Sequence, residues 1–299
     1  MRPLSILFVL STALATAQSD KHDQLDQRVQ AAITGFKGTV SLYAKNLDTG
    51  ESYGLRENER VPTASTIKLA IMATVFDAIA HKRAKWTDKI ILHDSDKVNG
   101  TGVLRELSDG VRLPVLDLVH LMIVVSDNTA TNLLLDKFTA DAVNAEMDSF
   151  GLKDTRSMRK VLIDGKPPSG FSKAGRLPEN ERFGLGSSTP REMATLIEKM
   201  ERGEVVSPQA SHDMITILKR QQLQYGIARK LGDMTVASKS GALNLLRSDV
   251  GIVYSPGGRI AIAITCEHLP KIDYSPDNPG DVLIAQLSAM LVEGLAKPK

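Results

Sequence analysis

Two residue types that can do chemistry together stand three positions apart near the start of the chain. Ser65 and Lys68 belong to the segment PTASTIK, residues 62–68. If a helix begins there, both side chains leave the same face, one turn apart. A serine hydroxyl is a weak nucleophile until a base takes its proton, and a partly buried lysine beside a second cation has a lowered pKa. The pair therefore predicts a nucleophile and its base.

Two further short motifs fall where predicted elements begin or end. The triplet Ser-Asp-Asn, residues 126–128, separates two helical patterns, and Lys-Ser-Gly, residues 239–241, ends a β-branched run. Together with Ser-x-x-Lys these triplets follow the order seen in class A β-lactamases and penicillin-binding proteins, with serine in place of the usual threonine. Each triplet is weak alone, but all three in order and in suitable contexts are a specific signal.

The chain resembles the penicillin-recognising serine hydrolases, and most of all their class A β-lactamase branch. The resemblance extends around the motifs, to VSDNTATNLL at residues 125–134 and TPREMA at residues 189–194. It covers the whole mature chain in element order, from a hairpin through helices to strands and a last helix. We therefore expect the α+β fold of that family.

The resemblance implies a role for each matching catalytic residue. Ser65 would attack the carbonyl of a strained β-lactam amide or of a D-alanyl peptide and form an acyl-enzyme. Lys68 would accept or relay the proton of that hydroxyl. Ser126 would pass a proton to the leaving nitrogen. Lys239 would place a positive charge beside the Ser126 hydroxyl and attract the substrate carboxylate.

The same resemblance implies the residues that hold the substrate. Asn128 would bind the amide of the substrate side chain, and Ser240 would bind its carboxylate. The backbone N–H of the nucleophile and that of Ala242 would form an oxyanion hole. Arg247, which follows this strand, is either a further carboxylate ligand or an exposed turn residue. The predicted substrate-binding residues are thus Asn128, Ser240, Gly241, Ala242 and Arg247.

The long segment between the helices, residues 151–188, shows no clear hydrophobic period and is expected to be a loop. It departs from the family pattern. Class A enzymes carry Glu-x-x-Leu-Asn there, whose glutamate activates the water that hydrolyses the acyl-enzyme. Here residues 176–186 read RLPENERFGLG, so Glu179 and Glu181 are the nearest candidates for the deacylation base, or else solvated charges. Three activities stay open: a serine β-lactamase, a D-alanyl-D-alanine carboxypeptidase or esterase, and a slowly deacylating β-lactam-binding protein.

The first residues predict export. Arg2 precedes an apolar run at residues 4–15 that is too short to span a bilayer, and Ala-Thr-Ala at residues 15–17 is a small-residue cleavage site. We expect a signal peptide over residues 1–17 and a mature chain that begins near Gln18 and is periplasmic or secreted. Its single cysteine, Cys266, excludes an intramolecular disulfide and lies in an apolar run, where we expect it to be buried.

The order of the elements predicts the domain organisation. Short β-branched runs lie at both ends of the chain and apolar helical periods lie between them. We expect a five-stranded antiparallel sheet and its flanking helices from residues 18–61 and 226–299, with a helical domain inserted over residues 62–225. Residues 99–102, with two glycines, are expected to form the rim of the pocket.

Other chemistries and partners have little support in the sequence. The six histidines include no His-Glu-x-x-His or other close pair, so we expect no metal and no cofactor. The formal charge of +2 falls to +1 without Arg2, which gives no attraction to nucleic acid or to an anionic membrane. We expect a monomer without a membrane span that acts on a small β-lactam or a peptidoglycan-type substrate.

Overall fold

The computed structural model describes residues 21–162 and 170–297. The predicted signal peptide, residues 1–17, lies outside these ranges. Among the described residues, no helix has the length and the apolar character that a membrane crossing requires.

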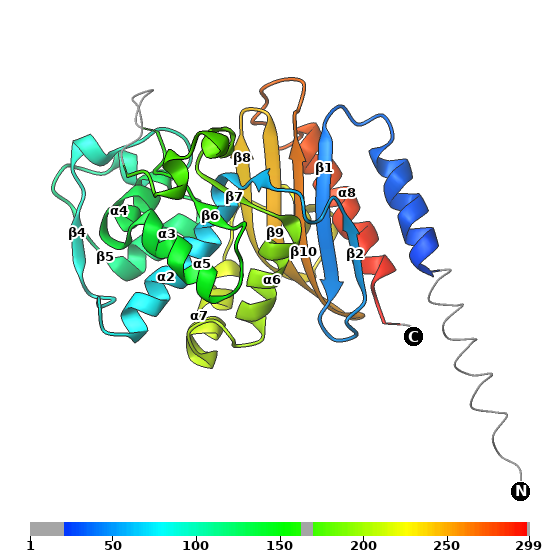
Figure 1. Cartoon of the computed structure of the whole chain (residues 1–299), viewed down its shortest axis with the longest axis horizontal. Helices are drawn as coiled ribbons and strands as arrows, with labels where there is room; N and C mark the ends of the chain where they lie inside the picture. Colours follow the sequence, from blue (N-terminus) through cyan, green and yellow to red (C-terminus); the bar gives the residue numbers. More distant parts are fainter. Residues whose placement is uncertain (1–20, 163–169, 298–299) are drawn as a thin grey trace, which may run out of the picture.

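A five-stranded antiparallel sheet, built from the two ends of the chain, is the central sheet of the fold (Figure 1). Its strand order is β2-β1-β10-β9-β8, so the first hairpin pairs with the last strands of the chain through β1 and β10. This confirms the predicted fold class. The strands are β1 (Thr39–Asn46), β2 (Ser52–Leu55), β8 (Thr235–Leu243), β9 (Leu246–Ser255) and β10 (Gly258–Glu267).

The two faces of the sheet bury alternate residues of each strand. Along β10, Ile262 and Ile264 pack with the helix at residues 21–33 and with α8 (Pro279–Gly294), whereas Ala261 and Ala263 face the other core. Cys266 lies on the first of these faces and is fully buried, as expected. The second face meets α6 (Pro190–Glu201) and the helical part of the molecule, so the sheet lies between two layers of helices (Figure 1).

The central part of the chain is helical, as its apolar periods predict. Thr189 and Ser207 cap α6 and α7 through their hydroxyls, which accept the N–H of Glu192 and of Ala210, each at 3.1 Å. A proline at the first position of each helix strengthens both starts. The α-helices are α2 (Lys68–Ala80), α3 (Val115–Val124), α4 (Asn128–Phe138), α5 (Ala140–Ser149), α6 (Pro190–Glu201) and α7 (Pro208–Leu218).

The long segment at residues 151–188 has more structure than its sequence predicts. Its strands β6 (Arg156–Ser157) and β7 (Gly186–Ser188) pair with β3 (Val61–Pro62) in the order β3-β7-β6. Strands of two or three residues are too short to carry a periodic signal, which is why the sequence shows only a loop. The pairing holds this segment against the residues that precede Ser65.

Short elements complete the described chain. Two short strands from the helical part pair as a small antiparallel sheet, and single 3-10 turns connect the larger elements. They are β4 (Lys89–Ile91), β5 (Arg112–Pro114), η1 (Ala64–Ile67), η2 (Asp94–Asp96), η3 (Leu104–Glu106), η4 (Ala174–Arg176), η5 (Pro178–Phe183) and η6 (Ile227–Lys230).

Candidate active site

Ser65 lies in the 3-10 turn η1, directly before α2 begins at Lys68. Ala64 before it adopts a left-handed backbone conformation with φ of 48°, which a residue with a Cβ rarely takes. Such strain persists only where the surrounding structure holds it, and it is common at functional sites. Ser65 is half-buried and lines a cavity, whereas Lys68 is fully buried beneath it.

The edge strand β8 passes directly beside this turn because residue 241 is a glycine. A Cβ on Gly241 would lie 2.8 Å from the carbonyl oxygen of Thr63 and 3.0 Å from the backbone nitrogen of Ser65. Both distances are shorter than ordinary van der Waals contact. The backbone of β8 and the start of η1 can therefore approach each other closely, which brings Ala242 to the cavity that Ser65 lines. This is the arrangement that an oxyanion hole of two backbone N–H groups requires.

Lys68 is fixed by three contacts with the Ser-Asp-Asn segment. Its Nζ donates to the carbonyl oxygen of Ser126 at 2.7 Å and to Oδ1 of Asn128 at 3.0 Å, and it lies 3.1 Å from Oγ of Ser126. Burial, together with the Lys239 cation, holds the pKa of Lys68 well below the usual range of a lysine. A neutral amine at this position has a lone pair that can take a proton, so Lys68 has the property that a general base needs.

Ser126 joins the two lysines. Its hydroxyl accepts a hydrogen bond from Nζ of Lys239 at 3.1 Å, and Lys239 also donates to the carbonyl oxygen of Ser240 at 2.7 Å. Ser126 has a left-handed backbone with φ of 56°, and its carbonyl oxygen also accepts the hydroxyl of Thr101 at 2.8 Å. The hydroxyl of Ser126 is therefore held between two amines, where it can pass a proton from one side to the other.

The turn that carries Ser126 is anchored by the next residue. The buried carboxylate of Asp127 accepts the backbone N–H of Ala130 at 2.8 Å, of Val103 at 2.6 Å and of Leu104 at 2.9 Å. It thereby caps α4 and ties the segment at residues 99–104 to the same place. Gly100 and Thr101 of this segment line the cavity, which confirms the predicted rim.

A buried carboxylate moderates the charge of the second lysine. Burial lowers the pKa of Lys239 to about 7, and the carboxylate of Asp249 opposes this shift. Burial in turn raises the pKa of Asp249 to about 7, and its Oδ2 accepts the backbone N–H of Ile227 at 2.9 Å. Asp249 faces Ser240 across the β8–β9 pair. No sequence motif marks Asp249, because only the strand register brings it to the site.

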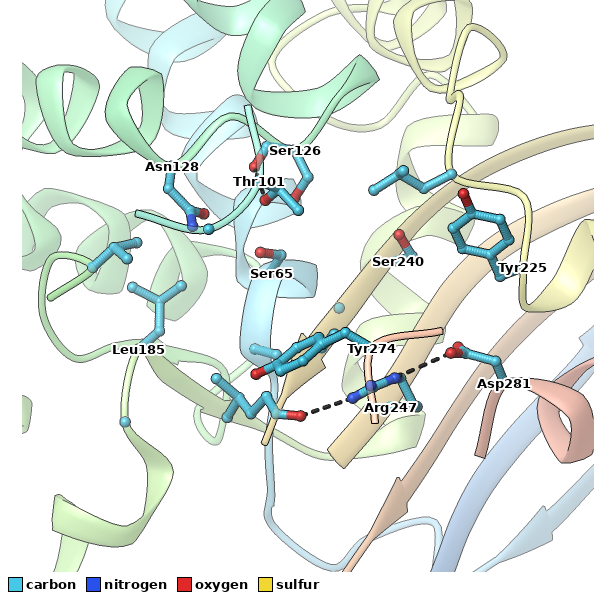
Figure 2. Close-up of a pocket in the computed structure, with 18 of the residues that line it drawn as sticks. Ser65, Thr101, Ser126, Asn128, Leu185, Tyr225, Ser240, Arg247, Tyr274 and Asp281 are labelled. Carbon is cyan, nitrogen blue, oxygen red and sulfur yellow. Dashed lines mark hydrogen bonds and ion pairs between the residues drawn. The ribbon is translucent and has the colours of Figure 1, made fainter. Parts of the chain in front are cut away.

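These groups surround one cavity of about 610 Å³. In Figure 2 the hydroxyls of Ser65, Ser126 and Ser240 point toward a common space, with Asn128 on one side and Tyr225 on the other. The predicted residues of the three motifs are thus brought together from η1, α4 and β8. Tyr225 and Tyr274, which sequence reasoning did not single out, add aromatic surface at the mouth.

Arg247 lines the cavity but is tightly held by its own surroundings. Its side chain is buried, forms an ion pair with Asp281 at 3.1 Å, and donates to the carbonyl oxygens of Leu243 at 2.7 Å and Leu246 at 2.6 Å. Its guanidinium also lies 4.9 Å from the ring centre of Tyr274. It is therefore no exposed turn residue, and a role in binding the substrate carboxylate stays a prediction.

The two candidate glutamates for deacylation lie apart from this cavity. Glu179 and Glu181 are exposed on η5, and neither of them lines the cavity of Ser65. The described residues of the long segment that line the cavity are Arg159, Val161, Leu162, Gly184 and Leu185, so they add apolar side chains and one cation but no carboxylate. Leu185 points toward the site in Figure 2. Among the described residues, the one carboxylate that lines the cavity is Asp281, and it is paired with Arg247.

Val161 is held in this wall by its backbone. The side chain of Asn132 accepts the N–H of Val161 at 2.8 Å and donates to its carbonyl oxygen at 3.1 Å. Asn132 lies on α4, one turn after Asn128. Asn132 is itself buried, and the sequence marks it only as a member of the family-like stretch at residues 125–134.

Comparisons with known proteins agree with this geometry. The model of the Beta-lactamase enzyme family matches residues 24–295. The chain belongs to the class A β-lactamase family. Among the curated members, β-lactamase L2 of Stenotrophomonas maltophilia is 29% identical over 230 residues, which are 75% of this chain and 66% of L2. The chain thus spans slightly less than two thirds of the length of that relative.

Solved structures of family members cover nearly the whole chain. The β-lactamase of Sphaerobacter thermophilus DSM 20745 is 32% identical with a TM-score of 0.78, and the match covers 92% of this chain and 98% of that one. PBP-A is 28% identical with a TM-score of 0.75, over 90% of this chain and 95% of PBP-A. A leucine-to-glutamate mutant of PBP-A is known as an acyl-enzyme complex with penicillin G. This class A family member is therefore similar both to β-lactamases and to a penicillin-binding protein.

Proposed function

We propose that this protein is a serine hydrolase that β-lactams acylate at Ser65 and that its turnover is limited by deacylation. The observation that carries the first half is the chain of contacts from Lys68 through Ser126 to Lys239, buried beneath a cavity that Ser65 lines. These groups supply a base, a proton relay and a cation at one place.

The acylation step follows from the protonation states of these groups. Neutral Lys68 takes the proton of Ser65 as its oxygen attacks the lactam carbonyl, and the C–N bond of the lactam then breaks. The hydroxyl of Ser126 gives its proton to the leaving nitrogen, and Lys68 then returns to Ser126 the proton that it took from Ser65. Lys239 stabilises that hydroxyl and attracts the carboxylate of the substrate. Backbone N–H groups of Ser65 and Ala242 face the developing oxyanion, and losing one such donor typically costs about 3 kcal/mol of transition-state stabilisation.

The proposed slow deacylation is inferred from the wall that the long segment gives to the cavity, in which the described residues include no carboxylate. Hydrolysis of the acyl-enzyme needs a base that takes a proton from water next to the ester carbonyl. In the described part of the long segment, Val161 and Leu185 line the cavity, while Glu179 and Glu181 face solvent. A wall of this kind supports slow release of the acyl group, which is kinetic behaviour closer to a penicillin-binding protein than to a fast β-lactamase.

Adding a carboxylate to the wall tests this proposal. In Val161→Glu and Leu185→Glu we expect faster decay of the acyl-enzyme, since a positioned general base contributes roughly 10²-fold to 10⁴-fold. Decay is followed by intact-mass spectrometry after a benzylpenicillin pulse. Leu116→Glu, at an exposed leucine of α3 that lines neither this cavity nor the one beside it, is the matched control and should decay like wild type. Fast decay in the unmodified protein, with no adduct at steady state, would refute the proposal.

A second candidate activity is hydrolysis of D-alanyl peptides or esters through the same acyl-enzyme. The likeness to PBP-A at 28% identity favours it. Release of D-alanine from a diacyl-D-alanyl-D-alanine peptide by wild type, and none by Ser65→Ala, would support this activity. No release from a protein that benzylpenicillin acylates normally would exclude it.

A further inference from the structure

A second cavity of about 640 Å³ lies beside the active-site cavity. The two cavities share Arg159 and Gly184 in their linings, so they adjoin at these two residues. Phe171 and Leu177, both partly exposed, contribute apolar surface to the second cavity, and Arg176 and Glu181 add one charge of each sign to its lining.

Arg159 at this junction has no acidic partner among residues 21–162 and 170–297. Its one hydrogen bond in that part of the chain is a long one, 3.3 Å, to the carbonyl oxygen of the adjacent residue, Lys160. The neighbouring cations differ, because Arg156 pairs with Asp148 at 2.6 Å and Lys160 pairs with Asp136 at 2.8 Å. Burial lowers the pKa of Arg159, yet a guanidinium keeps its charge at neutral pH. A partly desolvated cation that has no ion pair within the described part of the chain is a site that a carboxylate would satisfy.

The position of Arg159 indicates which part of a substrate would reach it. Arg159 precedes Val161 by two residues, and Val161 is bound to Asn132 on α4, one turn beyond Asn128. The predicted ligand of Asn128 is the amide of the substrate's acyl side chain. Arg247, which lies away from Asn128 on another side of the cavity in Figure 2, has its charge already balanced by Asp281. The unbalanced cation thus lies on the acyl side.

We propose that Arg159 and the second cavity bind a carboxylate at the far end of the substrate's acyl group. The preferred substrates are then acyl donors with an anionic side chain, such as a peptide that carries a side-chain carboxylate, with Phe171 and Leu177 packing on the apolar part of the chain. The proposal rests on the proposed function, because it concerns the group that acylates Ser65.

Penicillins with matched acyl chains test it. One series carries linear acyl chains of increasing length that end in a carboxylate, and the partner series ends in a primary amide. Stopped-flow mixing gives the second-order rate of acylation for each pair. At one range of chain lengths we expect the carboxylate to react faster by on the order of tenfold, the effect of one charge-assisted hydrogen bond.

Three variants test whether Arg159 causes the faster reaction of the carboxylate-ended penicillins. Arg159→Gln should abolish the carboxylate-to-amide rate ratio, and Arg159→Lys should keep part of it. Arg182→Gln is the matched control: Arg182 stacks on Phe183 in the same segment, lines neither cavity, and its loss should leave the ratio unchanged.

The results that overturn the proposal differ from those that overturn the acylation function. A ratio near one at every chain length in wild type, an unchanged ratio in Arg159→Gln, or an equal loss of both rates in that variant each refutes the carboxylate site. Absence of any adduct with benzylpenicillin in wild type refutes the acylation function itself.

Discussion

Replacing Gly241 with alanine would separate the strand that carries the oxyanion hole from the nucleophile. The new Cβ would lie 2.8 Å from the carbonyl oxygen of Thr63 and 3.0 Å from the nitrogen of Ser65, both of them backbone atoms. Restoring ordinary contact requires a displacement of about 0.6 Å. Since a misplacement of about 1 Å can cost on the order of 10²-fold in rate, we expect acylation to slow by roughly 10-fold to 100-fold.

A second glycine of the same sheet gives the control for this variant. In Gly251→Ala the Cβ would lie 2.8 Å from Cβ of Ser238 and 3.0 Å from the carbonyl oxygen of Ala237, so the overpacking is comparable. Gly251 does not line the cavity. Both variants should lose about 1–3 kcal/mol of the free energy of unfolding, measured by urea denaturation. Only Gly241→Ala should lose acylation rate, measured with nitrocefin, and a wild-type rate in that variant would refute the reasoning.

Two further predictions concern charge. Burial lowers the pKa of Lys239 to about 7, so its ammonium is lost as pH rises through 7. Acylation by benzylpenicillin should therefore slow more steeply above that pH than acylation by its methyl ester, which has no carboxylate for Lys239 to attract; identical stopped-flow pH profiles would contradict this. In Asp127→Asn an amide NH₂ would face the N–H groups of Val103 and Leu104, which should lower the free energy of unfolding by about 2–4 kcal/mol. Chemical denaturation checks this, and a change below about 0.5 kcal/mol would speak against it.

The local parts of the site could be predicted because short sequence spacing determines them. Ser65 and Lys68 are one turn apart, and the Ser-Asp-Asn and Lys-Ser-Gly triplets carry their chemistry within three residues. The sheet was likewise predictable, because alternation in Val40, Leu42 and Ala44 already separates its two faces, and these three residues do share one core.

The remainder depends on contacts between distant elements. Asp281 pairs with Arg247 across 34 residues, and Asn132 holds the backbone of Val161 across 29. Neither contact can be read from the residues around it in the sequence, because the partner in a single hydrogen bond can come from any part of the chain. Asp249 reaches the site only through the β8–β9 register. Sequence alone therefore shows which residues can react but not which side chains form the walls around them.

The central claim is that Ser65 is acylated and that the acyl group leaves slowly. Benzylpenicillin is mixed with wild type and with Ser65→Ala, and intact mass is followed over time, with peptide mapping of any adduct. We predict one adduct per molecule on the peptide that contains Ser65, persisting long after free lactam is removed, and none in Ser65→Ala. An adduct on another residue, or no adduct in the folded wild-type protein, would contradict the account.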